Sequence, residues 1–399
     1  MRYSITLMLL LLAMGSLSAG VPPFRIEQST VQTSTGAHHW SQSRAALIPG
    51  NPARVIVTTQ QNEKRGSHGY RDVFFTDTTD GGRTWSAPQR VDVLARAVGS
   101  DGKERVMGDI CPAWHAATGK LLLTGKTFGF LADAKDTAAK DDRSLERVAY
   151  AVYSPDKNEW SGMKEVTLPE KDHAGRKILE PNAGCNDRFD LPNGEILLPV
   201  RYRADPKTRQ YTTIVAHCVF DGEKLIYKEH GSELTFAGRR GLYEPSIIGH
   251  GGKFYLTMRA DESAFVSVSD DGLNYTPPAE WRYDDGKVLG SYNTQQHWIT
   301  NGGTLWLIYT RRGANNDHVF RHRAPIFIAQ VDPKKLCVLR STEQVLMPET
   351  GVDLGGGFAA LNVNASETWV ISTEMAFPEG RKDEDNRIRM ARIIWSGKD

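Results

Sequence analysis

The stretch Thr78-Thr79-Asp80-Gly81-Gly82-Arg83-Thr84-Trp85-Ser86 decides the expected fold. An aspartate followed by two glycines predicts a tight turn, because Asp can hydrogen-bond its own backbone and Gly tolerates a positive φ. Trp85 supplies a large apolar anchor directly after the turn. Residues 72–76 precede it and have the composition of a strand. The stretch therefore predicts one corner of a β-hairpin, with a role in architecture and none in chemistry.

Two later stretches repeat parts of this pattern. Residues 154–160 keep the serine, the aspartate and the tryptophan, and residues 269–275 keep the serine, the aspartate, a glycine and an aromatic residue. Both follow the second strand of a predicted pair, as the first stretch does. This shared placement indicates a repeated structural unit.

Six units of similar pattern follow one another along the chain. Each has a strand-like run, a turn rich in Gly, Asn or Pro, a second strand-like run, a polar loop and a further strand-like run. The six units span residues 43–76, 111–153, 187–220, 243–269, 296–331 and 358–395. No segment shows helical periodicity over three turns. Repeats of this length are typical of propeller blades, so the sequence predicts an all-β, six-bladed β-propeller over residues 25–399.

The first 20 residues have the pattern of a secretory signal peptide. Arg2 is followed by the apolar segment 5–14 and by small residues over 15–20. We therefore expect cleavage of residues 1–20, a secreted or periplasmic mature protein and no membrane anchor. The 49 basic and 48 acidic residues balance, which gives no indication of a nucleic-acid partner.

Metals, disulfides and oligomers receive little support from the sequence. The histidines lack a short ligand spacing, so we expect no metal site and no cofactor. The cysteines are too scattered for zinc, and although export permits disulfides, we expect all four to be small buried residues. They are Cys111, Cys185, Cys218 and Cys337. The sequence does not determine the oligomeric state.

One face of the predicted propeller collects polar residues. Neighbouring strands are antiparallel, so the start of each innermost strand and the end of the second strand share a face. Seven arginines fall at such positions: Arg44, Arg188, Arg201, Arg203, Arg259, Arg311 and Arg312. So many guanidinium groups are costly to bury without anionic partners, and their fork geometry suits carboxylates. We therefore expect a cleft for a carboxylate ligand.

At this point the chain resembles the sialidase superfamily. Residues 78–85 are similar to its Asp-box, and Glu244-Pro245-Ser246-Ile247 followed by Arg259 resembles its pairing of a glutamate with one member of an arginine triad. Arg44 and Arg323 stand where the other two arginines are expected, with Arg321 as a competitor for the last place. The resemblance implies a terminal acidic sugar whose carboxylate is held by Arg44, Arg259 and Arg323. Further substrate contacts predicted on the same face are Arg188, Gln296, Arg321 and His322.

The sequence departs from the family at two places. The family's tyrosine nucleophile lies in a segment similar to Gly-Tyr-Ser-Ser-Leu, but this chain has Phe358 there, which has no oxygen. The loop that carries the family's acid/base aspartate holds Ser67 and His68 instead. A mechanism through a covalent tyrosine intermediate is therefore doubtful.

Histidines are the predicted replacements, because imidazole titrates near neutral pH. The catalytic candidates are Glu244, His68, His115 and His297, and Tyr243 or Tyr292 are possible assistants. Three hypotheses remain open. The first is a sialidase-like glycoside hydrolase for a glycan or acidic oligosaccharide. The second is a lyase or hydrolase of uronic-acid polysaccharides. The third is a carbohydrate-binding propeller without catalysis.

Overall fold

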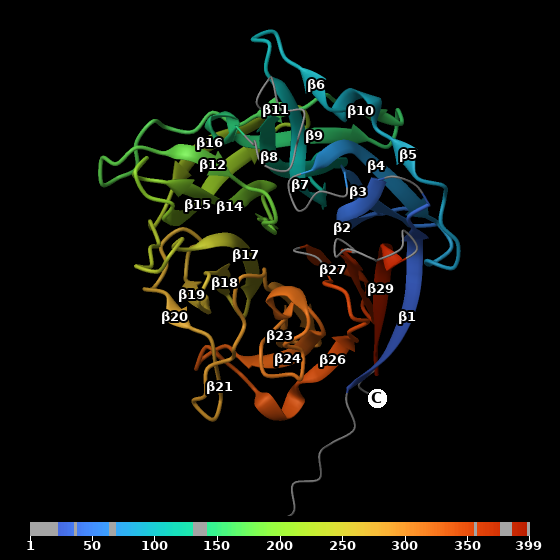
Figure 1. Cartoon of the computed structure of the whole chain (residues 1–399), viewed down its shortest axis with the longest axis vertical. Coiled ribbons are helices and arrows are strands. Elements are labelled where there is room, and N and C mark those ends of the chain that lie inside the picture. Colours follow the sequence, from blue (N-terminus) through green and yellow to red (C-terminus); the bar gives the residue numbers. More distant parts are fainter. Residues whose placement is uncertain are drawn as a thin grey trace, which may run out of the picture.

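The computed structural model describes residues 23–35, 38–63, 69–130, 142–354, 357–375 and 385–396. Six β-sheets lie in a ring around a central axis, which makes the molecule a six-bladed β-propeller (Figure 1). The predicted fold class is therefore confirmed. The predicted signal peptide over residues 1–20 lies outside the described residues and stays a prediction.

The strands of each sheet are consecutive in the chain, apart from the sheet that contains β1. The first sheet holds β2 (His38–Ile48), β3 (Arg54–Glu63), β4 (Tyr70–Thr78) and β5 (Gln89–Arg90). The second holds β6 (Ala97–Val98), β7 (Glu104–His115), β8 (Lys120–Phe130), β9 (Val148–Ser154), β10 (Glu159–Trp160) and β11 (Lys164–Glu165). The third holds β12 (Leu179–Asn182), β13 (Phe189–Asp190), β14 (Glu195–Arg203), β15 (Tyr211–Phe220) and β16 (Leu225–His230).

The second half of the ring repeats the arrangement. The fourth sheet holds β17 (Tyr243–His250), β18 (Lys253–Arg259), β19 (Ala264–Ser269) and β20 (Ala279–Glu280). The fifth holds β21 (Arg282–Tyr283), β22 (His297–Asn301), β23 (Thr304–Tyr309), β24 (Ile326–Asp332), β25 (Cys337–Val338) and β26 (Gln344–Met347). The sixth holds β27 (Phe358–Asn364), β28 (Glu367–Thr373), β29 (Arg387–Trp395) and β1 (Phe24–Thr33).

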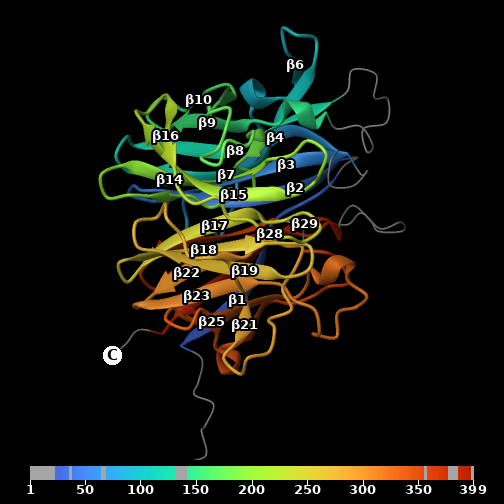
Figure 2. The ribbon, with the colours of Figure 1, turned by 90° about the vertical axis from the view of Figure 1, so that its left-hand side faces the viewer.

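The two ends of the described chain close the ring together. β1 pairs antiparallel with β29, from Phe24 opposite Trp395 to Thr33 opposite Arg387. Figure 1 shows β1 beside β29, and the side view of Figure 2 shows the strands of successive sheets stacked around the ring. Because the outermost strand of the sixth sheet comes from the N-terminal end, the ring cannot open without breaking this strand pair.

The core lies between neighbouring sheets. One cluster joins Ile308 and Ile328 of the fifth sheet to Val370 and Ile393 of the sixth, all fully buried. Alternating apolar residues on these strands explain the packing, since each sheet buries both faces against its neighbours. All four cysteines are buried and unpaired, as expected from the sequence.

The stretch that began the sequence analysis forms a tight turn after β4. Asp80 Oδ1 accepts hydrogen bonds from Thr78 Oγ1 at 2.8 Å and from the amide of Arg83 at 2.9 Å. Its other oxygen accepts the Thr84 hydroxyl at 2.6 Å. The ring of Trp85 lies 6.1 Å from that of Trp369 on β28. The turn therefore anchors the first sheet against the sixth.

The turn after β19 has the same hydrogen-bond scheme. Asp271 Oδ1 accepts from Ser269 Oγ at 2.8 Å and from the amide of Asn274 at 2.7 Å. In the third stretch, Asp156 instead pairs with Lys120 at 2.8 Å. Two of the three predicted turns thus share one geometry.

Helices are few in this fold. Those of the described residues are three-residue 3₁₀ turns: η1 (Asp92–Leu94), η3 (Arg143–Leu145), η4 (Phe320–His322) and η5 (Arg340–Thr342). In the described part of the chain, no helix has the length and apolar character needed to cross a membrane.

Candidate active site

A ring of β-bulges places polar side chains at the centre of the propeller. Gln42 on β2, Asp109 on β7 and Glu244 on β17 have positive φ values of 54°, 52° and 47°, and the strand register shifts at each of them. Cys185 and Asn293 have φ values of 65° and 51° at the corresponding places of the third and fifth blades. This backbone costs about 1–2 kcal/mol per non-glycine residue and clusters at functional sites. The bulges re-aim the side chains of Gln42, Asp109 and Glu244.

A cleft of about 880 Å³ opens over this ring. Gln42, Asp109, Cys185 and Glu244 line it, together with residues of the loop 317–323. Among its described lining residues, seven are Lys or Arg and five are Asp or Glu. The excess of positive charge favours an anionic ligand.

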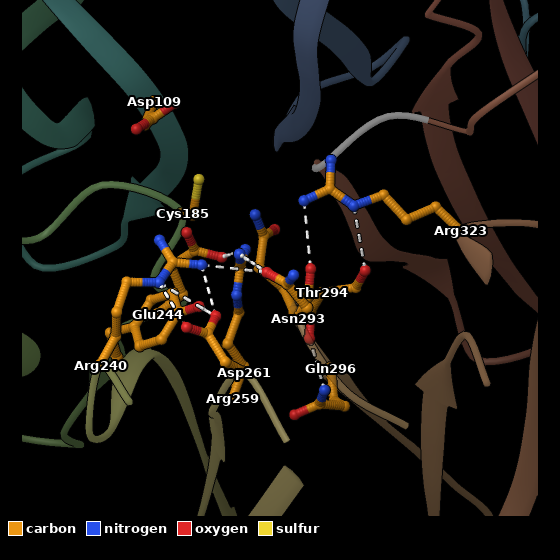
Figure 3. A network of polar contacts seen from close by, with 12 residues as sticks. Asp109, Cys185, Arg240, Glu244, Arg259, Asp261, Asn293, Thr294, Gln296 and Arg323 are labelled. Carbon is orange, nitrogen blue, oxygen red and sulfur yellow. Dashed lines mark hydrogen bonds and ion pairs between the residues drawn. The ribbon is translucent and has the colours of Figure 1, made fainter. Parts of the chain in front are cut away.

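Asn293 is the hub of an arginine cluster. Its amide oxygen accepts a hydrogen bond from Arg259 Nη2 at 2.7 Å and one from Arg240 Nη2 at 3.1 Å. Its carbonyl oxygen accepts one from Arg323 Nη2 at 3.1 Å. Figure 3 shows Arg323 approaching Asn293 from the side opposite to Arg240 and Arg259. The asparagine therefore holds three guanidinium groups close together although they repel one another.

Most of these cations have an acidic partner. Arg259 pairs with Glu244, Arg240 with Asp261, and Arg323 Nη1 lies 3.6 Å from Asp353 Oδ2. These pairs offset the cost of burying the arginines. They also fix the guanidinium planes in advance of ligand binding.

Arg321 differs from the other arginines of the cleft. Among the described residues, no carboxylate pairs with it, and its guanidinium lies 4.8 Å above the ring of Phe320. Partial burial and then the positive charges of Arg323, Arg259 and Arg240 lower its pKa. Because the neighbouring cations repel Arg321, an anion bound beside it would be stabilised electrostatically.

A second polar group lies on the other side of the cleft. The Tyr70 hydroxyl donates to Asp109 Oδ1 at 2.7 Å, and Lys126 Nζ lies 2.8 Å from Asp109 Oδ2. Burial alone would raise the pKa of Asp109, but the ammonium of Lys126, the hydrogen bond from Tyr70 and the charge of Arg44 together hold it well below its ordinary value. Burial, and then the charge of Asp109, raise the pKa of Tyr70 well above its usual range. Asp109 is thus ionised beside a protonated phenol.

Tyr243 stands beside Glu244 at the wall of the cleft. Its hydroxyl donates to Asp261 Oδ1 at 2.7 Å, and its ring stacks 4.5 Å from the guanidinium carbon of Arg259. Burial raises the pKa of Tyr243 to about 12. The phenol is therefore protonated at neutral pH and positions the arginines.

The rim of the cleft carries two histidines of the loop 317–323. His322 Nδ1 contacts the Tyr292 hydroxyl at 2.5 Å, and His322 Nε2 lies 3.0 Å from Asp317. His318 Nε2 lies 3.1 Å from Glu349. Both histidines line the cleft, and His322 was a predicted substrate contact.

Three predicted site residues lie beneath the floor of the cleft. Arg44 is buried and donates to Gln42 at 3.1 Å and to Gln295 at 3.0 Å. His297 is buried against Asp187, with Nδ1 and Oδ2 2.5 Å apart. Gln296 is buried as well and accepts from Thr257 Oγ1 at 3.1 Å. None of the three lines the cleft, so they support its floor.

Phe358 belongs to the same buried layer. Its ring is fully buried and stands edge-on to that of His297 at 5.1 Å. The side chain predicted to stand at the family's nucleophile position is therefore packed below the cleft.

Two other predicted residues lie away from the cleft. His115 is at the far end of β7, where its Nε2 contacts the Gly194 carbonyl at 2.8 Å. Arg188 donates to the carbonyl of Leu122 at 2.8 Å and pairs with Asp190. Both form contacts between neighbouring sheets, which corrects the sequence-based placement on the arginine-rich face. His68 lies outside the described residues, and its role stays a prediction.

The sequence analysis did not select several residues that line or organise the cleft. They include Tyr70, Arg240 and Asn293. A usable signal was present, because a turn glycine follows four such residues after seven to ten positions: Gln42, Asp109, Glu244 and Asn293. Aligning the units on their turns would have selected these residues.

Comparisons with known proteins show the fold. A protein of unknown function from Dyadobacter fermentans matches with a TM-score of 0.65 and 14% identity, over 94% of this chain and all of that one. The sialidase of Trypanosoma rangeli, bound to the inhibitor DANA, matches with a TM-score of 0.60 and 13% identity over 89% of this chain. A Hadza microbial sialidase gives 0.60 and 12% over 89%. The chain spans 55% and 65% of the lengths of these two sialidases.

No protein-family model matches the chain, and no curated protein is significantly similar in sequence. The structural matches therefore establish a sialidase-like propeller, and the chemistry has to be argued from the site itself.

Proposed function

We propose that this protein is an exported, sialidase-like glycoside hydrolase that acts on a terminal acidic sugar of the sialic-acid type. The single observation that carries the proposal is Arg321, a cation without a carboxylate partner among the described residues, held beside Arg259 and Arg323. A sugar carboxylate would supply the missing negative charge. Arginine suits this role because its two parallel donors fit a carboxylate.

The proposed clamp uses Arg259, Arg321 and Arg323. Arg259 and Arg323 are held by Asn293, and Arg321 completes the group from η4. The clamp predicted from the sequence contained Arg44 in place of Arg321. The burial of Arg44 beneath Gln42 supports the change.

The proposed acid–base groups are Glu244 and Asp109. Both carboxylates line the cleft, so they can face the sugar from different blades. Asp109 is ionised and suits stabilisation of an oxocarbenium-like transition state or activation of water. The Tyr70 phenol stays protonated and donates a hydrogen bond to Asp109, which orients the carboxylate. His68 remains the sequence-based candidate for a general acid.

The burial of Phe358 favours a second candidate, a lyase acting on uronic-acid polysaccharides. Such an enzyme needs no nucleophile at this position. It needs a base for the proton beside the sugar carboxylate and cations that stabilise the resulting enolate. The arginine cluster fits the second requirement as well as it fits hydrolysis.

Proton NMR separates the two candidates. We expect the purified protein, given an aryl α-sialoside or sialyllactose, to release sialic acid, with the anomer formed first reporting inversion or retention. An unsaturated, ultraviolet-absorbing product from a uronic-acid polymer, without sialic acid release, would favour the lyase. Binding of the sugar with no product from either substrate would contradict both and support a carbohydrate-binding propeller.

The same preparation tests export. We expect the protein from the periplasm or the medium to begin near residue 21, which N-terminal sequencing checks. A chain that retains Arg2 in its final compartment would contradict the predicted signal peptide.

A further inference from the structure

A second cluster of potential ligands lies at the outer edge of the third blade, and none of its members lines the cleft. It consists of His173 in the connection between β11 and β12, His230 at the end of β16, and Glu233. β16 is the outermost strand of its sheet, which Figure 1 shows at the periphery of the ring. We propose that these three side chains bind a divalent transition-metal ion of the zinc type, with water completing the coordination.

The distances fit a shared ion. One ligand atom from each of the three residues lies within 4.8 Å of the others. His230 Nε2 is 3.4 Å from Glu233 Oε1, and His173 Nδ1 is 3.7 Å from the same oxygen. Two ligands at zinc–ligand distances of about 2.0–2.1 Å in a tetrahedron lie about 3.4 Å apart. Both nitrogen–oxygen separations are therefore close to the spacing of two ligands on one zinc ion.

The donor set selects the class of metal. Imidazole nitrogens with one carboxylate oxygen suit zinc, cobalt and nickel, whereas calcium and magnesium prefer oxygen ligands.

The surroundings orient the ligands. The Tyr227 hydroxyl lies 2.7 Å from His230 Nδ1, so that nitrogen is engaged and Nε2 is left for the ion. Glu233 Oε1 also accepts the backbone amide of His173 at 2.6 Å, and Arg176 lies 3.8 Å from the other oxygen, Oε2. Arg176 therefore tunes the carboxylate without occupying the oxygen that both rings face.

The two imidazole rings are stacked, with centroids 4.1 Å apart and planes inclined by 7°. Because ligand lone pairs lie in the ring planes, binding requires one ring to tilt toward the ion. His173 is exposed and can tilt, while His230 is buried and fixed. The bound ion would tie the segment between β11 and β12 to β16, the outermost strand of the third blade.

Titration of the mature protein with Co²⁺ tests the proposal. The protein carries no histidine tag and is treated with a chelator beforehand. We expect one equivalent of Co²⁺ to bind with visible absorption bands, Zn²⁺ to displace it, and excess Zn²⁺ to raise the melting temperature. His173→Gln and Glu233→Gln should each weaken binding at least tenfold. The exposed His173 makes its variant safe for folding.

His217→Gln is the matched control. His217 also lies between two carboxylates, but Glu195 contacts its Nε2 at 3.0 Å and Glu229 its Nδ1 at 3.4 Å. These contacts use opposite ring nitrogens, so a single ion cannot join them. Absence of Co²⁺ bands in the wild type, or equal affinity of the wild type and His173→Gln, would overturn the proposal. Loss of binding in His217→Gln alone would overturn it as well.

Discussion

At the residue scale, Arg321 has the most distinctive environment in the cleft. Its charge faces other arginines, and apart from the contact with the Phe320 ring it has no compensating carboxylate among the described residues. A negatively charged ligand would compensate the positive charge of Arg321. A side chain kept in this state is better explained by binding than by folding.

We predict that Arg321→Gln weakens binding of a carboxylate sugar and leaves the fold unaffected. A hydrogen bond to a charged group contributes about 1.5–3 kcal/mol, so the affinity should fall by roughly 10- to 100-fold. The melting temperature should stay the same or rise slightly, because a like-charge repulsion is removed. Calorimetric titration with the free sugar and a thermal melt provide the two measurements.

Arg282→Gln is the control, since Arg282 is an exposed arginine that pairs with Glu280 outside the cleft. It should bind the sugar as the wild type does. An Arg321→Gln variant with unchanged affinity would show that the ligand carboxylate lies elsewhere.

Phe358→Tyr should fail to restore a nucleophile. The ring is fully buried below the cleft, so a new hydroxyl would point into the packed layer beside His297. An unsatisfied buried hydroxyl costs about 1–3 kcal/mol, and we expect denaturant unfolding to show a loss of this size without a gain in kcat. A gain in turnover with retention of configuration would show instead that residue 358 reaches the substrate.

At the element scale, the bulges explain how the blades produce a site. Without a bulge, the side chains of an innermost strand would alternate regularly, and every second one would point at a neighbouring blade. A bulge adds one residue and re-aims the chain. Repeating this in three blades brings Gln42, Asp109 and Glu244 to the lining of one cleft.

Two substitutions of Asn293 separate its backbone role from its side-chain role. Asn293→Gly relieves the positive φ but removes the amide oxygen that holds Arg240 and Arg259, whereas Asn293→Ala loses the amide and keeps the strain. We expect both variants to lose sugar affinity to a similar extent. Asn293→Ala should be less stable than Asn293→Gly by about 1 kcal/mol, measured by denaturant unfolding. Full affinity in Asn293→Gly would show that the arginines do not depend on this residue.

The turn after β19 carries a pH-dependent contribution to stability. Burial alone would raise the pKa of Asp271, but hydrogen bonds from Asn274, Leu273 and Ser269 lower it from 3.8 to about 2. A lowered folded-state pKa means that the stabilisation is complete above the unfolded value and is lost as the pH falls toward 2. Asp271→Ala should therefore be less stable than the wild type at pH 6, and the difference should close between pH 4 and 2.

Asp270→Ala is the neighbouring control, because Asp270 contributes an exposed ion pair with Lys253. Urea unfolding across this pH range should show almost no difference from the wild type. A constant gap between Asp271→Ala and the wild type down to pH 2 would contradict the titration argument.

The sequence predicted the blades better than it predicted the cleft. Turn chemistry and strand composition are local, so the six units and the pair Glu244–Arg259 could be recognised. A bulge leaves no mark in the pattern of apolar residues, and β7 starts well before the residues assigned to it. For that reason His115 was expected where Asp109 lies. Tyr70 acts through a contact with Asp109 on a different blade, which no spacing reveals.

At the scale of the whole molecule, closure of the ring holds the blades in place around the cleft. Each blade contributes only part of the site, so the relative positions of the sheets decide whether the arginines and carboxylates converge. The strand pair between β1 and β29 completes the sixth blade. Loosening it should therefore affect stability before it affects any single contact in the cleft.

We predict that Phe24→Ala lowers the free energy of unfolding by about 3 kcal/mol or more. Phe24 is buried where two blades meet. Its ring lies 5.5 Å from that of Trp306 on β23 and 5.1 Å from that of Trp395 on β29. Its truncation leaves a cavity between the fifth and sixth sheets, which denaturant unfolding measures.

Ile226→Ala provides the comparison, because Ile226 also lies on an outermost strand but is 43% exposed. Its truncation removes little buried surface and should change stability by less than about 1 kcal/mol. If the pairing of β1 with β29 holds the cleft together, the Phe24→Ala variant should still bind the sugar normally at 25 °C. On heating, it should lose the sugar at a lower temperature than the Ile226→Ala variant. Equal thermal loss in the two variants would mean that the cleft is held by its own blades, independently of the strand that closes them.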